Sequence, residues 1–449
     1  MDRINHFLAT AVDVAWGPPL VVLVVGGGLA LSLYARFLPL RKAGHAIRIL
    51  RGEFDDENDP GQISHLQALS TALASTIGLG NIGGVAVAIT QGGPGAVFWM
   101  WVAALVGMAT KFFTCTLAVM YRGRDSLGQL QGGPMYYIEE GMGKRFRILA
   151  VIFASCGLVG CLPMFQSNQM AEILDEAYSI PRWLTGALGV SFVMAVAWGG
   201  IERIGRVTSR LVPLMCGVYL LGSLWVLALN VELLPGVLHQ IFHDAWNGTA
   251  ATGGAAGITV ATVIRIGVRR AAFSNEAGIG TAPMAHGAAR TSEPVREGLI
   301  AMLGPFIDTI VICSLTAFVI LSSGLWTTQE VRGVSLTGQA FEAALGGGGR
   351  LLLIAAVIFF GASTMVGYSY YGRKCFSYLF GAENARRYDT IFLGGLFLGA
   401  LFSAEAVVNL VDIAFALMAL PNMIAALFLA PRVMAGTRDY FRRMASSTP

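Results

Sequence analysis

The stretch Thr76-Ile77-Gly78-Leu79-Gly80-Asn81-Ile82-Gly83-Gly84 places four glycines and an asparagine in the middle of an apolar segment. Each glycine weakens a helix by about 1 kcal/mol relative to alanine. Opened backbone at membrane depth is tolerated only where it is buried in protein or lines a cavity. The stretch therefore favours an interrupted membrane helix whose free backbone groups hold a small zwitterion and a cation. The alternative is a packing seam of small residues without a ligand.

The composition of the chain supports a membrane setting for this stretch. The chain has 449 residues, of which 55% are hydrophobic and 13% charged, and its mean hydropathy is +0.63. These values exclude an ordinary soluble enzyme, a disordered chain, collagen and a coiled coil. Apolar segments of bilayer-spanning length predict eleven transmembrane helices, near residues 17–37, 66–91, 96–121, 148–170, 183–200, 208–229, 252–273, 298–323, 350–371, 389–404 and 406–430.

The basic residues predict an orientation in the membrane. When the connecting loops are assigned alternately to the two sides, most of the 31 lysines and arginines fall on one side. They form the clusters 36–51, 122–147, 203–210, 265–296, 373–387 and 432–443. Because basic loops stay in the cytoplasm, we expect an outer N-terminus and a cytoplasmic C-terminus. A bacterial inner or plasma membrane is the expected location.

A second glycine cluster, Gly253-Gly254-Ala255-Ala256-Gly257, follows five spans after the first. Two five-helix halves result, residues 61–230 and 231–430, and each begins with an interrupted helix. Residues 1–60 then supply an extra span, and residues 431–449 form a cytoplasmic tail. Because five is odd, the halves have opposite orientations in the membrane. This arrangement predicts an inverted-repeat secondary transporter with its site near the bilayer midplane.

Polar side chains within the spans are candidate ligands. The adjacent hydroxyls of Ser363 and Thr364 are oxygen ligands suited to sodium, although such residues also bond to their own helix. Asp308 and Asp412 are costly at membrane depth, so each is an ion or proton ligand or a structural hydrogen-bond partner. Three arginines, Arg265, Arg269 and Arg270, lie close in sequence to Glu276. This group predicts either a cytoplasmic gate of ion pairs or a solvated basic face.

Other functions fit the residues poorly. The spacing of Gly78, Gly80 and Gly83 matches a dinucleotide-binding loop, but no strand precedes it and no acidic residue follows about 20 positions later. His239 and His243 lack the glutamate of a zinc protease motif. No span holds a cluster of catalytic groups, so we expect no enzyme activity. We also expect no metal other than sodium, no organic cofactor, no nucleic acid and no obligate protein partner.

Several blocks of the sequence together resemble the alanine or glycine:cation symporter family. The first runs from Gly92 to Trp101 (Gly-Gly-Pro-Gly-Ala-Val-Phe-Trp-Met-Trp) and continues to Gly107. The others are Gln131-Gly132-Gly133-Pro134-Met135-Tyr136-Tyr137, Gln166-Ser167-Asn168, Phe273-Ser274-Asn275-Glu276-Ala277-Gly278, Phe306-Ile307-Asp308-Thr309, Ser369-Tyr370-Tyr371-Gly372 and Met418-Ala419-Leu420-Pro421-Asn422. The matches extend from about residue 18 to residue 440.

The resemblance implies an all-α membrane protein of LeuT type, with a five-plus-five inverted repeat and one extra N-terminal helix. It implies import of a small neutral amino acid, alanine or glycine, together with sodium by alternating access. The implied sodium site consists of carbonyls of Ala74, Ile77 and Phe360 with the hydroxyls of Ser363 and Thr364. The implied substrate site consists of Thr76, Gly78, Leu79, Gly80 and Asn81, with Phe165, Thr259 and Tyr368 around the substrate side chain.

Two residues depart from the family pattern near this site. Leu79 stands where the family usually has threonine, which removes a hydroxyl. Tyr368 stands where the family usually has tryptophan, which makes the side chain smaller and adds a polar tip. Both change the expected pocket, so serine and glutamine are alternative substrates. Proton coupling through Asp308 is the alternative to sodium.

Overall fold

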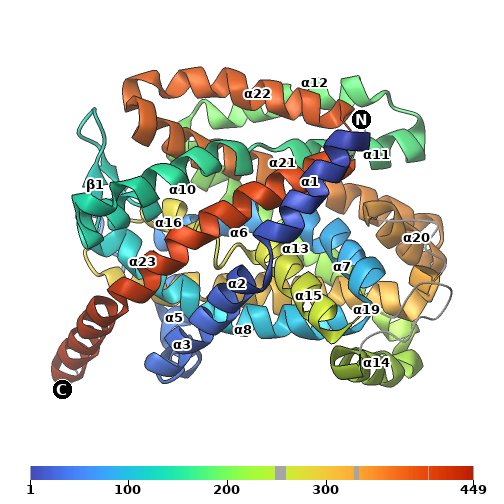
Figure 1. Cartoon of the computed structure of the whole chain (residues 1–449), viewed down its shortest axis with the longest axis horizontal. Coiled ribbons are helices and arrows are strands. Elements are labelled where there is room, and N and C mark those ends of the chain that lie inside the picture. Colours follow the sequence, from blue (N-terminus) through green and yellow to red (C-terminus); the bar gives the residue numbers. More distant parts are fainter. Residues whose placement is uncertain (1, 248–258, 328–332, 403, 448–449) are drawn as a thin grey trace.

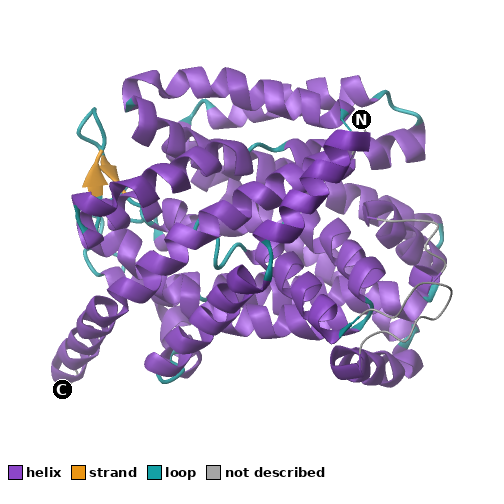
Figure 2. Cartoon of the chain, viewed as in Figure 1, coloured by secondary structure: helices purple, strands orange, loops and turns teal. Residues whose placement is uncertain are grey.

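The apolar segments form helices in the computed structural model of the protein, which describes residues 2–247, 259–327, 333–402 and 404–447. Within these residues the strands are confined to one antiparallel hairpin, β1 (Gly123–Arg124) and β2 (Leu130–Gln131), with Gly123 opposite Gln131 (Figure 2). Six described helices are long and apolar enough to cross a membrane, or eight if each of two bent pairs is one span. An all-helical membrane protein is therefore confirmed, while the number of eleven spans stays a prediction.

The N-terminal part and the predicted first half of the chain contain α-helices, labelled α, and short π- or 3-10 helices, labelled η. The part before the first half comprises α1 (Asp2–Ala15), α2 (Pro18–Val21), η1 (Val22–Gly26), α3 (Gly27–Tyr34), α4 (Leu38–Arg41) and α5 (Ala43–Leu50). The first half comprises α6 (His65–Thr76), η2 (Gly80–Gly84), α7 (Val85–Gly92), α8 (Gly95–Met120), α9 (Pro134–Tyr136), η3 (Tyr137–Met142), η4 (Lys144–Phe146), α10 (Arg147–Gly160), α11 (Met164–Tyr178), α12 (Arg182–Ala197) and α13 (Gly200–Leu229).

The rest of the chain includes the predicted second half. It comprises η5 (Val231–Leu233), α14 (Leu234–Asn247), α15 (Val260–Asn275), α16 (Ala282–His286), α17 (Pro294–Ala301), α18 (Leu303–Pro305), η6 (Phe306–Cys313), α19 (Ser314–Ser323), η7 (Leu325–Thr327), α20 (Gly333–Leu345), α21 (Gly347–Phe380), η8 (Ala382–Asn384), α22 (Ala385–Leu401) and α23 (Ala404–Ser447). In both halves a broken helix comes before the long helices.

The first break lies in the glycine-rich stretch that the sequence singled out. Helix α6 ends at Thr76, the backbone leaves helical geometry at Ile77 (ψ 89°), and the chain bends by 52° before it continues as η2 and α7. Gly78 permits a close approach to α21, because a Cβ atom at this position would lie 2.3 Å from Oγ1 of Thr364. The first break is thus in direct contact with α21.

A second break lies about 20 residues after the glycine cluster 253–257. Helix α15 ends at Asn275, and the chain turns through Glu276 (φ 54°) and Gly280 (φ 99°) before α16 begins. The cluster 253–257, where the interruption was expected, lies outside the described residues. Glycine is needed at position 280 because the backbone is left-handed and a Cβ atom would lie 2.6 Å from the Asn422 side chain.

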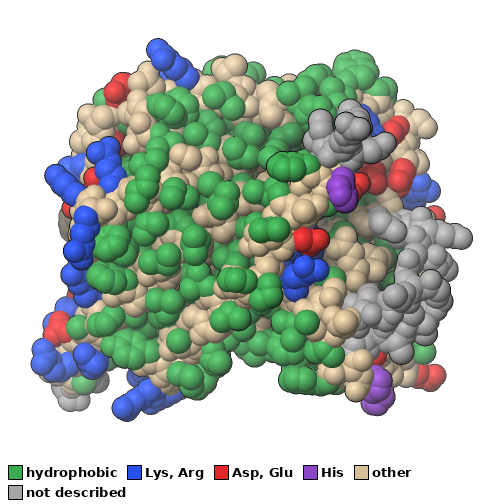
Figure 3. All heavy atoms as spheres, viewed as in Figure 1, with side chains coloured by type: hydrophobic (Ala, Val, Ile, Leu, Met, Phe, Trp, Pro, Cys, Tyr) green, Lys and Arg blue, Asp and Glu red, His purple; other side chains and the backbone are tan. Residues whose placement is uncertain are grey.

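The charged side chains separate toward two ends of the molecule. Figure 3 shows Lys and Arg gathered along one edge, where Figure 1 places the hairpin, α5 and the end of α23. Asp and Glu gather at the opposite edge, where α11, α14 and α20 lie. We call these the basic end and the acidic end. This separation agrees with the predicted orientation of the loops.

One group of arginines is not where the sequence analysis placed it. Arg265, Arg269 and Arg270 lie on α15, before the second break, and not at the basic end. Arg265 pairs with Asp13 of α1 (3.4 Å), while α1 packs along α23 (Figure 1). The second break falls after these arginines in the chain, and Glu276 bonds to Thr281 and Tyr368 instead of to them.

Gly267 tests how tightly the broken helix α15 packs on α8. A Cβ atom there would lie 2.5 Å from the carbonyl oxygen of Ala96, whereas no atom lies within 4 Å of one at Gly217 on α13. We expect Gly267→Ala to lower the melting temperature in detergent, since overpacking costs about 1–3 kcal/mol. The matched Gly217→Ala variant should keep or raise it, because alanine favours helix. Equal melting of the two variants would contradict this packing.

Candidate functional site

Four oxygen atoms from two helices meet beside the first break. The hydroxyls of Ser363 and Thr364 on α21 lie 3.2 and 3.1 Å from the carbonyl oxygen of Ala74 on α6. The same hydroxyls lie 2.9 and 3.0 Å from the carbonyl oxygen of Phe360. Each hydroxyl has one hydrogen, so it serves only one of the two carbonyls at a time. Carbonyl and hydroxyl oxygens at an unwound helix are the ligands that membrane carriers use for sodium.

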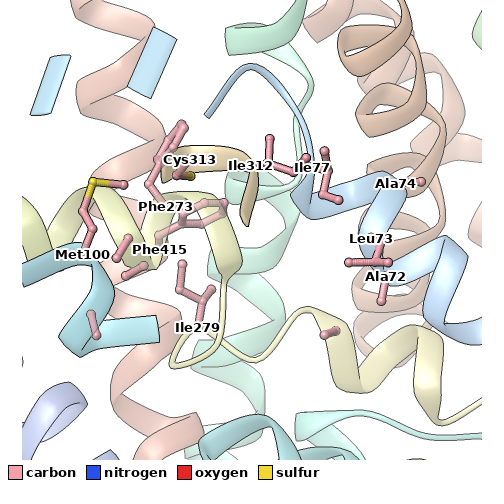
Figure 4. Close-up of a cluster of buried hydrophobic side chains, with 14 of the residues drawn as sticks. Ala72, Leu73, Ala74, Ile77, Met100, Phe273, Ile279, Ile312, Cys313 and Phe415 are labelled. Carbon is pink, nitrogen blue, oxygen red and sulfur yellow. The ribbon is translucent and has the colours of Figure 1, made fainter. Parts of the chain in front are cut away.

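Ile77 and Gly78 complete the backbone around these oxygens. Both residues are buried, and Ile77 is the last residue whose amide bonds to α6, donating to Leu73 at 2.6 Å. The structure therefore brings four of the five expected sodium ligands into direct contact and places Ile77 at the break beside them. Figure 4 shows Ile77 next to Ile312 of η6, on the apolar side of the break.

Asn81 joins the first break to η6. Its side-chain oxygen accepts a hydrogen bond from the amide of Gly78 at 2.9 Å. Its side-chain nitrogen donates to the carboxylate of Asp308 at 2.8 Å and to the carbonyl oxygen of the same residue at 3.0 Å. All of these groups are buried, so Asn81 replaces the helical hydrogen bonds that the break removes.

Asp308 is the centre of a buried polar network. Its carboxylate accepts hydrogen bonds from the hydroxyls of Ser274 at 2.8 Å and Thr309 at 2.7 Å, in addition to the bond from Asn81. The side chain of Asn275 donates to Thr309 at 3.0 Å, so both broken helices reach the same carboxylate. Three side-chain donors are the arrangement that an ionised carboxylate requires when it is buried.

An aromatic cluster covers the first break. The rings of Phe165 (α11) and Phe273 (α15) stand edge to face with centroids 5.2 Å apart. Phe273 also packs on Phe415 of α23, as Figure 4 shows. A Cβ atom at Gly80 would lie 3.3 Å from the Phe273 ring, so a glycine allows this close contact. Phe165 is thus near the backbone at which the sequence predicted the substrate.

A hydrogen bond between Tyr368 and Glu276 joins α21 to the second break. The Tyr368 hydroxyl donates to the buried carboxylate of Glu276, and the Thr281 hydroxyl donates to its other oxygen. The sequence named Tyr368 for the substrate site and Glu276 for a gate with the arginines. The signal for the role of Glu276 is the run of three polar residues, Ser274, Asn275 and Glu276, directly after the apolar span predicted at 252–273.

The side chains of Leu79 and Thr76, two further residues of the predicted substrate site, make packing and helix contacts. Leu79 is fully buried, and one of its methyl carbons lies 3.6 Å from where a Cβ atom at Gly361 would be. Met170 of α11 approaches the same point, so Leu79 packs between α11 and α21. The Thr76 hydroxyl donates back to the Ala72 carbonyl at 3.1 Å and is engaged with its own helix.

Thr259 lies apart from the other predicted site residues. It is exposed and caps the N-terminus of α15, where its side chain accepts a hydrogen bond from the Thr262 amide. Phe273 lies fourteen residues further along, which is about 21 Å of helix. We therefore leave Thr259 out of the site. Phe273 takes the corresponding place on α15.

A cavity of about 480 Å³ opens above the aromatic cluster toward the acidic end. Residues of six elements line it, and beside Phe165 they include the polar and charged side chains of Gln91, Gln169, Glu172, Arg269 and Arg270. Arg269 and Arg270 both donate to the buried carboxylate of Asp412 on α23. Asp412 is therefore an ion-pair partner of α15, one of the two roles that the sequence left open.

At the basic end, one buried carboxylate joins the two broken helices. Glu297 of α17 accepts hydrogen bonds from His65 at the start of α6 (2.9 Å) and from His286 at the end of α16 (3.1 Å). All three side chains are buried. One carboxylate thus holds the ends of both broken helices.

Arg122, which follows α8, fastens the adjoining loops. Its guanidinium donates to the carbonyl oxygens of Gly287 (2.9 Å), Thr291 (3.0 Å) and Pro60 (3.1 Å), and also to that of Ala289. Burial lowers the pKa of Arg122 from its ordinary value, and the nearby Glu297 opposes this shift. The carbonyl oxygens replace the water that a charged guanidinium would otherwise bind.

Comparisons with known proteins agree with this architecture. The family model described as the sodium:alanine symporter family matches residues 1–448. The chain is 40% identical over 450 residues to the sodium/alanine symporter AgcS of Methanococcus maripaludis, covering 98% of this chain and 96% of AgcS. It is 34% identical to the probable sodium/glutamine symporter GlnT of Bacillus subtilis, covering 98% of this chain and 91% of GlnT.

A solved structure shows the same fold at low sequence identity. The crystal structure of MhsT in complex with L-phenylalanine superimposes with a TM-score of 0.55 and 14% identity. The match covers 84% of this chain and 99% of MhsT. The LeuT-type fold expected from the sequence is therefore confirmed.

Arg122 can be tested as the residue that closes the basic end. We expect Arg122→Lys to speed amide hydrogen exchange in residues 60–63 and 287–291 by about tenfold or more. Lysine lacks the planar fork, and each lost bond to a charged donor is worth about 1.5–3 kcal/mol. Hydrogen exchange with mass spectrometry measures this. The control is Arg124→Lys, because Arg124 bonds only within its own hairpin, to Gly128. Unchanged exchange in Arg122→Lys would contradict this role.

Proposed function

The chain belongs to the sodium:alanine symporter family, and we propose that it imports alanine or glycine together with sodium by alternating access. Cation-coupled symport of an amino acid follows from the membership. The choice of sodium and of a small substrate is our proposal. The observation that carries it is the contact of four oxygen atoms, from Ala74, Phe360, Ser363 and Thr364, beside an opened helix.

Sodium would act on the hydrogen bonds of these oxygens. Without a cation, the two hydroxyl hydrogens are shared between the two carbonyls. A cation attracts all four oxygens, so both hydroxyls turn their hydrogens away and their lone pairs inward. Sodium binding would therefore clamp α6 against α21 and fix the first break. The carbonyl of Ile77 is the fifth ligand in this proposal.

The substrate would bind on the backbone that this clamp orders. We place its carboxylate and ammonium groups at the break around Thr76, Gly78, Gly80 and Asn81, with Leu79 beside it. Its side chain would face Phe165, Phe273 and Tyr368. Leu79, Phe165 and Phe273 are buried and large, which favours a substrate with a small side chain.

The network around Asp308 supports sodium over proton coupling. Three side-chain donors, from Asn81, Ser274 and Thr309, stabilise the ionised form of its carboxylate. Asp308 therefore suits a fixed negative charge that attracts a cation. Lys111 of α8 is also buried.

The two ends of the molecule support alternating access. At the basic end, Arg122 and Glu297 hold both broken helices together, while a cavity of about 480 Å³ opens at the acidic end. If the acidic end is outside, this is a state in which substrate enters from outside. Inward release then requires the contacts of Arg122 and Glu297 to separate.

Sodium coupling can be tested by uptake into proteoliposomes. We expect uptake of labelled alanine or glycine to require an inward sodium gradient. Ser363→Ala and Thr364→Ala should each raise the sodium concentration for half-maximal uptake at least about tenfold, because each removes one ligand. Ser322→Ala is the control, since among the described residues Ser322 bonds only to Val319 at the end of α19. Uptake driven by a proton gradient without sodium would instead support proton coupling.

The orientation can be tested with introduced cysteines. His243→Cys on α14 places an exposed thiol at the acidic end, and Ser446→Cys places one near the end of α23. In intact cells, we expect an impermeant maleimide to label position 243 above the wild-type background and to leave position 446 unlabelled until the cells are opened. The reverse pattern would overturn the proposed outer N-terminus.

A further inference from the structure

A second cavity, of about 540 Å³, lies between α12, α21 and α22, away from the oxygens beside the first break. Ser369 and Arg373 line it from α21. Ser369 follows Thr364 by five residues, so it points about 140° away around the helix. The cavity therefore lies on the outward side of the helix that supplies two of the proposed sodium ligands.

The walls of this cavity are largely apolar. Val193, Met194 and Ala197 come from the end of α12, and Phe392 and Leu393 come from α22. Figure 1 shows α12 and α22 side by side at the periphery of the molecule. Such walls on a membrane-facing side suit an acyl chain.

The cavity also lies at the depth of lipid headgroups. Trp198, which follows α12, lines it and is 66% exposed. Tryptophan is enriched where a membrane meets water. Arg386, in the first turn of α22, lines the same cavity, and Ser126 of the hairpin loop bonds to the preceding turn at Ala382. The hairpin marks the basic end, so the cavity opens at the membrane surface of that end.

The charges in the cavity leave one guanidinium without a partner. Arg373 donates three hydrogen bonds of 2.7–3.0 Å to Asp389, so the charges of these two side chains neutralise each other. Arg386 makes no ion pair or side-chain hydrogen bond with the part of the chain that the structure describes. The net charge contributed by these three lining residues is therefore positive, and it matches a phosphodiester with a single negative charge.

We propose that this cavity binds an anionic phospholipid of the phosphatidylglycerol type. The phosphodiester lies on Arg386, with Arg373 and the hydroxyl of Thr390 as further donors, and an acyl chain follows the apolar wall of α12 and α22. Basic pockets between transmembrane helices on the cytoplasmic side bind anionic headgroups in this way. A bound lipid would join α21 to α12 and α22.

Native mass spectrometry of the purified full chain tests this proposal. The protein in detergent is titrated with phosphatidylglycerol or with phosphatidylcholine of the same acyl chains. We expect wild type to retain phosphatidylglycerol about fivefold more than phosphatidylcholine, a ratio typical of one basic residue at a membrane surface. Arg386→Gln should bring the ratio close to one. Arg387→Gln removes the neighbouring exposed charge, which does not line the cavity, and should leave the ratio unchanged.

A second variant separates the cavity from surface charge. Ala197→Phe fills the apolar wall and keeps both arginines, so it should reduce retention of phosphatidylglycerol while the melting temperature in detergent stays near that of wild type. Equal effects of Arg386→Gln and Arg387→Gln, or no preference in wild type, would overturn the proposal. Displacement of the lipid by millimolar inorganic phosphate would also overturn it, because the site would then bind free phosphate.

Discussion

Two helices of this protein are opened where a membrane offers no water, and their backbone groups must find partners within the protein. At the first break, Asn81 accepts from the Gly78 amide, and Ser363 and Thr364 donate to the Ala74 carbonyl. At the second break, Asn422 donates to the Gly278 carbonyl at 2.7 Å, and the Asn275 side chain accepts from the Ala277 amide at 3.0 Å. These side chains determine which helices must lie beside each break.

Much of the fold follows from the sequence because its signals are local. The length and apolar character of the segments identify helices, and the density of glycines at 78–84 identifies the first break. The second break could not be found in the same way. It depends on one left-handed glutamate, Glu276, and on Gly280, whose need for a small side chain comes from Asn422 in a helix 142 residues away.

The site was predictable to the extent that neighbours in sequence are neighbours in space. Ser363 and Thr364 are adjacent, and their contact with Ala74 agrees with what the resemblance implied. Thr259, which the resemblance implied, lies at the start of α15, fourteen residues before Phe273. The links from Asp308 to Ser274 and from Tyr368 to Glu276 cross between helices, and no spacing within the sequence specifies them.

The contacts at the basic end and at the breaks join the same helices to one another. Asp308 is bonded from both breaks, and Glu297 is bonded by both broken helices at their far ends. Asp308 and Glu297 lie only eleven residues apart, on the continuous run of helices from α17 to η6. In the proposed mechanism, a cation that draws α6 toward α21 would therefore act on a broken helix that is hydrogen-bonded at two depths, to Glu297 of α17 and to Asp308 of η6. Because these hydrogen bonds to carboxylates would be lost if the two broken helices separated, we expect the broken helices to move together. They would then move against helices that neither carboxylate contacts, α12 and α22 among them.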